Sequence, residues 1–452
     1  MLTSFRKPRK SFSRRKSLLL LPLLALAMGA WADDDVPASP LRFSGFATLG
    51  MTHNDNAQVG AIYSSAQRHP ANKGWSPNLD TVVGLQADWQ IQDGTSVTVQ
   101  GVARAGNDGD PELRMAYVRQ QLTNETALRV GRIRSPLFFD SDVSEIGYAY
   151  MMVRPPMVLY GTMNSVAGLD GGDLQWRHSF GDVAVMLQGY YGNYGYKHRF
   201  YNLSPVAEAD AQLDNIRGLA ITASLPKVTM RVSRTWVDRY SMRSAQVSQV
   251  NSGLGQVSSG LLLAAQNPFL PPAMAAGLTN EANQIAGLKN PFDNKPIYTS
   301  VGFDSTLDNW RLLGEWTQLD SQSRMVGKYE GFHLTTGYSL GDFTPYVSVA
   351  RYERKSKALD TSAFVATGMD PTLDAAIAQM KAGLDQSAQY ANLSTRSISY
   401  GVRWDLRDNM ALKVQYDRMT TPNAMVPGYF AVKSLPIDNK VNLLTVALDM
   451  VF

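Results

Sequence analysis

The chain has 452 residues, with 43 Lys and Arg against 39 Asp and Glu and no cysteine. The lack of cysteine excludes a disulfide framework and a thiolate metal site. Beyond the N-terminal region no stretch reaches 18 consecutive apolar residues, which excludes helical membrane spans. A polar chain of this kind can cross a membrane only as a closed β-barrel, because only helices and barrels satisfy every backbone polar group in lipid.

Residues 1–32 have the order of a secretory signal peptide. Seven basic residues lie between Arg6 and Lys16, an apolar run covers 18–30, and Ala30-Trp31-Ala32 supplies the small residues of a cleavage site. Cleavage after Ala32 removes seven of 43 basic residues and no acid, leaving 36 against 39 and a net charge of −3. The sequence pI of about 9.0 therefore belongs to the precursor, and it does not indicate nucleic-acid binding.

The rest of the chain, 33–452, is predicted to form one all-β domain, because alternation of apolar and polar residues recurs along it. Ser397 to Leu406, for example, places Ile398, Tyr400, Val402 and Trp404 on one face and polar residues on the other. Sixteen segments follow this pattern, at 41–51, 80–91, 95–105, 112–121, 126–133, 171–180, 182–192, 213–225, 227–237, 296–307, 309–320, 327–340, 342–355, 395–406, 409–420 and 440–452.

The connections between these segments alternate in kind. Seven are tight turns of one to three residues, and the others are mostly long: 52–79, 106–111, 134–170, 193–212, 238–295, 321–326, 356–394 and 421–439. An even strand count, with short periplasmic turns at one rim and long extracellular loops at the other, is typical of a transmembrane antiparallel β-barrel in the outer membrane. An eighteen-strand barrel stays open as an alternative if 238–295 contains one more hairpin.

Two of the long loops are not simply polar. Gln249 to Leu288 is rich in Ala, Gly, Ser and Leu. In 356–394, Asp370-Pro371 is followed by apolar residues at helical spacing, which predicts a capped amphipathic helix. Three interpretations of these loops stay open: a lid over a channel mouth, a contact between subunits, and a variable exposed surface.

Aromatic residues and the chain end support the barrel. Six of the eight tryptophans fall in predicted strands, several near a strand end, where indole rings prefer the headgroup level. Leu444, Val446, Leu448, Met450 and Phe452 form an apolar row to the final residue. Pairing of this last strand with the first removes the exposed edge of the sheet.

These residues resemble the Gram-negative outer-membrane porins. Leu41 to Gly50 is similar to the family's first strand, Tyr400 to Tyr416 to its penultimate hairpin, and Arg129-Val130-Gly131-Arg132 to the strand that enters its third loop. The resemblance implies homotrimers in the outer membrane, among lipopolysaccharide, with the third loop folded into each pore. It also implies that Phe452 is the signal read by the barrel-assembly machinery.

The function expected is a water-filled channel for ions and small hydrophilic solutes, with 134–170 as the constriction loop. Such channels select by size and by charges at the narrowest point. The candidates for the acidic side are Asp140, Asp142 and Glu145. The candidates for a basic, lumen-facing wall are Arg42, Arg104, Arg114, Arg129, Arg132, Arg177, Arg403 and Lys413.

Other classes of function are less well supported. No G-x-S-x-G, H-E-x-x-H, glycine-rich phosphate loop or Cys/His metal spacing occurs, so we expect no enzyme, cofactor or metal site. A substrate-selective or loop-gated channel stays open, as does a barrel that serves as an adhesin or receptor through its long loops. Anion or cation preference does not follow from the sequence.

Overall fold

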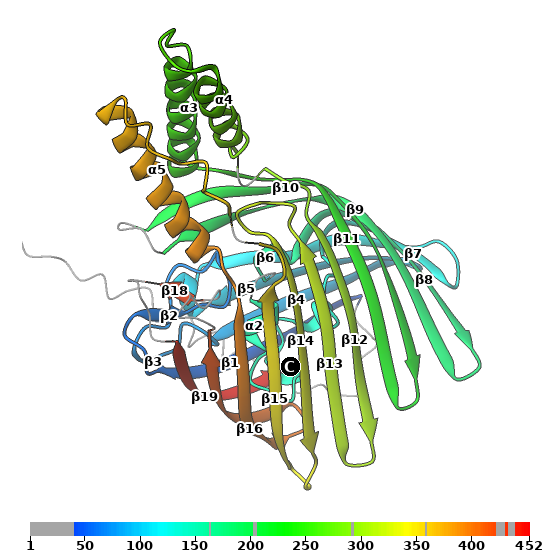
Figure 1. Ribbon diagram of the computed structural model, residues 1–452. Coiled ribbons are helices and arrows are strands. Elements are labelled where there is room, and N and C mark those ends of the chain that lie inside the picture. Colours follow the sequence, from blue (N-terminus) through cyan, green and yellow to red (C-terminus); the bar gives the residue numbers. More distant parts are fainter. Residues whose placement is uncertain are drawn as a thin grey trace, which may run out of the picture.

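The computed structural model describes residues 40–161, 164–201, 206–290, 293–357, 359–421, 430–432 and 439–452, so the predicted signal peptide lies outside the described residues. Sixteen strands form the barrel (Figure 1): β1 (Leu41–Asn54), β4 (Val82–Gln92), β5 (Thr95–Arg104), β6 (Pro111–Gln121), β7 (Thr126–Arg134), β8 (Gly168–Phe180), β9 (Val183–Phe200), β10 (Ala207–Leu225), β11 (Val228–Arg243), β12 (Ile297–Leu307), β13 (Trp310–Asp320), β14 (Lys328–Tyr338), β15 (Phe343–Arg354), β16 (Thr395–Arg407), β17 (Met410–Thr420) and β19 (Lys440–Val451).

Antiparallel ladders join each of these strands to the next, and the ladder between β1 and β19 closes the ring. Its register pairs Phe46 with Val451 and Asn54 with Leu443. Three short strands stand apart: β2 (Val59–Ala61) pairs with β18 (Phe430–Val432), and β3 (Gly74–Ser76) pairs with the end of β1. The predicted closed barrel of sixteen strands is confirmed, and the segment 238–295 supplies helices rather than another hairpin.

The two faces of the barrel differ as the alternation predicts. On β14, Phe332 and Leu334 are exposed outward, whereas His333 and Thr335, which alternate with them, are buried. At the rim of short turns, which is periplasmic in such barrels, exposed aromatic side chains gather at strand ends: Trp89, Phe180, Trp310, Phe343 and Trp404. This arrangement matches the aromatic girdle expected at a membrane interface.

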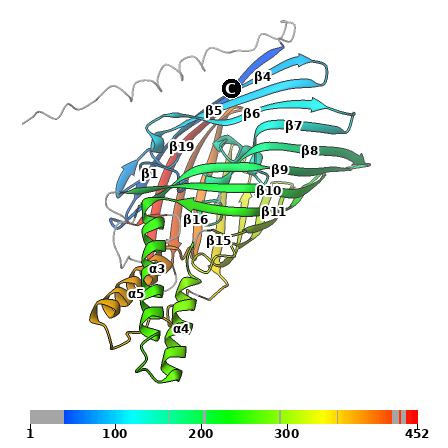
Figure 2. The ribbon, with the colours of Figure 1, turned by 90° about the horizontal axis from the view of Figure 1, so that it is seen from above.

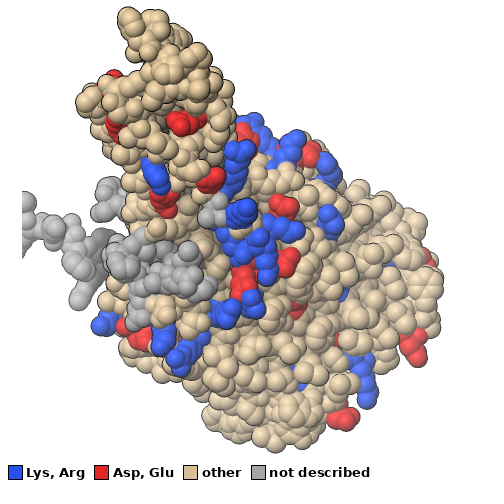
Figure 3. All heavy atoms as spheres, in the orientation of Figure 1, with Lys and Arg blue, Asp and Glu red and all other residues tan. Residues whose placement is uncertain are grey.

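The opposite rim carries charge on its outer surface. Figure 3 shows Lys and Arg side chains gathered between the helical projection and the broad surface of the barrel. At the upper ends of β15 and β16, Arg351, Arg396 and Lys355 surround Glu353. A change from apolar to charged side chains along the strands marks the edge of the lipid-facing band.

Three helices rise from the extracellular rim (Figures 1 and 2): α3 (Ala245–Ala265) and α4 (Pro272–Ala286) between β11 and β12, and α5 (Pro371–Tyr390) between β15 and β16. Asp370 caps α5 through two backbone amides, which confirms the predicted capped helix, and Ser244 caps α3. The helices share one apolar core. In the described part of the chain, no helix combines the length and the apolar character needed to span a membrane.

Candidate functional site

The third loop, L3 (135–167), connects β7 to β8 and contains the short helices η2 (Ser141–Val143), η3 (Gly147–Ala149), α2 (Met157–Tyr160) and η4 (Asn164–Val166). The side chains of α2 pack against inward-facing aromatic residues of β14 and β15, Tyr329 and Tyr352. Near its start, the Phe139 amide donates to Glu315 of β13 at 3.0 Å. L3 therefore folds against the inner wall of the barrel, and three ionic clusters bind it there.

The first cluster surrounds Glu145 of L3. Arg104 of β5 forms an ion pair with this carboxylate, and nitrogens of Arg114 and Arg134 lie 3.4 and 3.3 Å from it. The Glu145 side chain is only 4% exposed, and the Arg104 guanidinium also lies 3.9 Å over the Tyr63 ring. Glu112 lies 3.2 Å from Arg114, so two carboxylates among three guanidinium groups leave the cluster with a formal excess of one positive charge.

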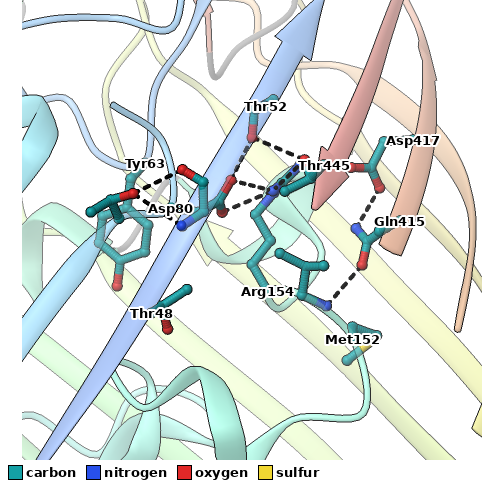
Figure 4. Close-up of polar contacts among 12 residues, drawn as sticks. Thr48, Thr52, Tyr63, Asp80, Met152, Arg154, Gln415, Asp417 and Thr445 are labelled. Carbon is teal, nitrogen blue, oxygen red and sulfur yellow. Dashed lines mark hydrogen bonds and ion pairs between the residues drawn. The ribbon is translucent and has the colours of Figure 1, made fainter. Parts of the chain in front are cut away.

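The second cluster centres on Arg154 (Figure 4). Its Nη1 donates to both carboxylate oxygens of Asp80 at 2.8 Å, and its Nη2 donates to Asp417 at 2.7 Å. Thr52 and Thr445 add hydroxyl contacts. All three charged side chains are at most 7% exposed. Because buried charges need both a partner and hydrogen bonds, this set fixes L3 to β1, β17 and β19.

The third cluster holds the lower part of L3. Lys413 of β17 is fully buried, lies 2.8 Å from Asp449 of β19, and donates to the carbonyl oxygens of Gly147 and Met152 at 2.7 and 2.9 Å. A Cβ at Gly147 would approach an Asp449 oxygen to 2.2 Å, so glycine is needed for this close contact.

The remaining predicted acids differ in exposure. The Asp142 side chain is 56% exposed and lies 3.6 Å from Arg231 of β11. Asp140 is half-buried, and its desolvation, together with the negative charges of Glu315 and Asp304, raises the pKa of its carboxyl to about 7. Of the three predicted acids, Glu145 is thus buried in ion pairs, and Asp142 is the most exposed to solvent.

The predicted basic residues fall into separate groups. Arg104, Arg114 and Lys413 contact L3 as described, and Arg403 joins them by donating to the carbonyls of Tyr148 and Tyr150, both at 2.7 Å. Others lie along the inner wall or near the periplasmic rim: Arg129 paired with Asp173, Arg42 opposite Asp88, and Arg177 bonded to Gln175.

The structure corrects the predicted position of Arg132 in the channel wall. It pairs with the exposed Asp170 across β7 and β8 at 2.6 Å, on the outer side of the strand, whereas Arg129 and Asp173 pair on the inner side. Residues three positions apart on a strand face opposite sides, so Arg129 and Arg132 cannot both face the lumen. Arg132 does not belong to the channel wall.

Phe452 pairs with the start of β1. Its amide and carbonyl form hydrogen bonds with Gly45 at 3.0 and 2.7 Å, and a Cβ at Gly45 would lie 2.5 Å from the Phe452 ring. The final residue therefore takes part in closing the barrel.

Sequence reasoning did not select Asp80, Asp417, Asp449, Arg134 or Arg154. A usable signal existed for two of them, because Asp417 and Asp449 alternate with apolar residues and so face the lumen. A charge at such a position in a membrane strand indicates an internal partner. Arg154 lies in a connecting segment, where no periodicity points to a partner, and Asp80 is the first residue of the predicted strand 80–91 but lies just before β4.

No family model and no curated protein matches the chain. Among solved structures it is similar to Salmonella typhi OmpF in complex with daunomycin (11% identity, 91% of this chain and 97% of that chain, TM-score 0.49) and to the anion-selective porin from Comamonas acidovorans (10%, 91% and 99%, 0.49). It is also similar to the outer membrane channel DcaP of Acinetobacter baumannii (9%, 91% and 97%, 0.49).

Identities and TM-scores of this size carry no argument about function, and the fold rests on the strand pairing described above. The chain is a closed antiparallel β-barrel of sixteen strands with an apolar outer band, and the solved structures that it is similar to include outer-membrane porins.

Proposed function

We propose that this protein is an outer-membrane channel for passive diffusion of ions and small hydrophilic solutes, with L3 as its filter. One observation carries the proposal: L3 folds into the closed barrel, and buried ion pairs hold it to strands on several sides of the wall. Export would use the signal peptide, cleaved after Ala32.

The inner wall suits a water-filled path. From β4 to β5, Gln86 and Gln100 share an amide hydrogen bond of 2.9 Å, and Thr98 donates to Asp88 at 2.6 Å. Such hydrogen-bonded polar side chains face the lumen in channel-forming barrels, whereas the lipid face is apolar.

Selection would arise from the charges fixed around L3. Three guanidinium groups surround Glu145 on one side, and the carboxylate of Asp142 is exposed on the same loop. Charges held in a narrow, low-dielectric passage attract or repel permeant ions more strongly than charges in bulk water do.

The proposal includes the partners that the family resemblance implies: a homotrimer, lipopolysaccharide around the barrel, and the barrel-assembly machinery acting on Phe452. It assigns no covalent chemistry, cofactor or metal to the chain. The rival proposal is an adhesin or receptor that binds an external partner through the helices of the long loops.

Purified protein in planar lipid bilayers tests the proposal. We expect discrete, ohmic conductance steps, and in a salt gradient we expect Glu145→Gln to shift the reversal potential towards anion preference, because one lumen carboxylate is lost. Glu281→Gln on α4 is the matched control and leaves the reversal potential unchanged. Folded barrels that give no conductance and no solute flux would favour the receptor and refute the channel.

A further inference from the structure

A second feature lies between L3 and the helices. A cavity of about 1030 Å³ is lined by L3, by the upper ends of β9–β13 and by α3 and α5. This size is at the upper end of the range for small-molecule sites. Leu137 and Val166 of L3 contribute to its lining, so the cavity adjoins the proposed filter.

The barrel strands change polarity where they line this cavity. In the upper part of β10, Ala209, Ala211 and Leu213 face inward and are buried, whereas the residues that alternate with them, Glu208, Asp210 and Gln212, are exposed. This is the reverse of the lipid-facing part of the strand, where Leu219 and Ile221 are exposed. The barrel wall that extends above the membrane is therefore polar outside and apolar inside.

The helices supply the facing wall. Val250 and Gly253 of α3 and Met380 of α5 line the cavity. A Cβ at Gly253 would lie 2.2 Å from the Met380 methyl carbon, so glycine lets the flexible thioether lie close against α3. Thioether and aliphatic side chains form an adaptable apolar surface for rings.

Polar side chains also line the cavity, among them Gln249 and Gln256 of α3 and Gln379 of α5, and with one exception they are uncharged. Among the described lining residues, Arg199 is the charged one, and it pairs with Glu208 at 2.7 Å. The Tyr196 and Tyr240 hydroxyls lie 3.3 Å apart. The buried Nδ1 of His198, which also lines the cavity, has no hydrogen-bond partner within the described part of the chain. A buried polar atom without a partner is costly, and a ligand that bonds to it removes this cost.

We propose that this cavity binds neutral, amphipathic aromatic solutes, a ring carrying a hydroxyl or amide group, before they reach L3. The ring would lie between the apolar inner wall of β10–β11 and the helices, and its polar group would bond to His198 Nδ1. The proposal rests on the proposed channel function and names a solute class for it. Burial without a counter-charge disfavours ions at the same site.

Equilibrium dialysis of 1-naphthol against the full protein in lipid nanodiscs tests the binding, with empty nanodiscs subtracted. We expect saturable binding of one naphthol per chain, weakened more than about tenfold for 1-naphthalenesulfonate, because an unpaired charge would be desolvated. Glucose, which has no apolar face, is expected not to compete.

Two variants locate the site. Met242→Gln places an amide in the apolar wall at nearly constant volume and is expected to weaken naphthol binding about tenfold. His198→Phe keeps the ring but removes the acceptor, with an expected loss of about fivefold. Met369→Gln, an exposed residue outside the cavity lining, is the matched control and binds as the unaltered protein does.

The outcomes separate this inference from the channel itself. Ohmic conductance without saturable naphthol binding would overturn the inference and leave the channel standing. Saturable binding without conductance would support the cavity and refute the channel. If all variants bind naphthol equally, or if the sulfonate binds as well as naphthol, the assigned site is wrong. Heat-modifiable electrophoretic mobility checks that each variant is folded.

Discussion

Replacing Arg154 by Met removes the charge that two buried carboxylates share. Nitrogens of Arg154 lie 2.8 Å from Asp80 and 2.7 Å from Asp417. Breaking a buried ion pair by removing one partner typically costs about 3–5 kcal/mol, because the other charge stays buried without compensation. With two carboxylates exposed to this penalty, we expect a loss in the free energy of unfolding at or above the lower end of that range.

The assay is urea unfolding of the barrel in lipid vesicles, followed by tryptophan fluorescence, with single-channel recordings of the same variants. Arg132→Met is the matched control, since Arg132 and Asp170 are 34% and 45% exposed. Its effect on the free energy of unfolding should stay below about 1 kcal/mol. Because L3 loses one anchor in Arg154→Met, we also expect noisier conductance in that variant alone.

A triple variant refines the test. Adding Asp80→Asn and Asp417→Asn to Arg154→Met removes the unpaired charges, and part of the lost stability should return. If Arg154→Met unfolds like the control, or if the triple variant is less stable than the single one, the cluster does not anchor L3 as argued.

Three further predictions concern L3 and barrel closure. The pKa of Asp140, raised from 3.8 to about 7, means that its carboxyl stays protonated in the folded protein after the unfolded chain has ionised, so its contribution to stability falls as pH rises from about 4 to 7. As the Asp140 carboxyl ionises near pH 7, cation preference measured from reversal potentials should rise, and Asp140→Asn should abolish this rise. A rise that persists in Asp140→Asn would contradict the assignment of this pKa to Asp140. Gly147→Val should loosen L3, because a Cβ there meets Asp449 at 2.2 Å, and limited proteolysis in L3 at unaltered rates would count against this. Phe452→Ala should lower the yield of folded barrel in membranes but not the conductance of barrels that do fold, and an unchanged yield would remove its assembly role.

The strands were predictable because lipid outside and water inside impose a period of two on every strand. All sixteen predicted segments coincide with barrel strands, although β9, β10 and β11 extend several residues further into the extracellular space. In that extension the inner face is apolar, which the rule for membrane-embedded strands does not anticipate.

The site was less predictable, because a loop's partners are chosen by tertiary structure. The sequence located Glu145 in the third loop and named Arg104 and Arg114 for the channel wall, but it did not indicate that these two and Arg134 surround Glu145. The prediction that Arg129 and Arg132 both face the lumen was wrong, because alternation along a strand places residues three positions apart on opposite faces. Ser244 caps the start of α3. The composition of 238–295 indicated an apolar loop, but it did not predict the helices in this segment.

The most direct test of the account uses the absence of native cysteine. Asp142→Cys places the only thiol on the exposed side chain of L3, and Phe269→Cys places one on a side chain that is 93% exposed between α3 and α4. A negatively charged methanethiosulfonate should lower the single-channel conductance at 142, and a positively charged one should shift the reversal potential towards anion preference. Neither reagent should act at 269. Complete labelling of 142, verified by mass, with conductance and selectivity unchanged would contradict a filter formed by L3.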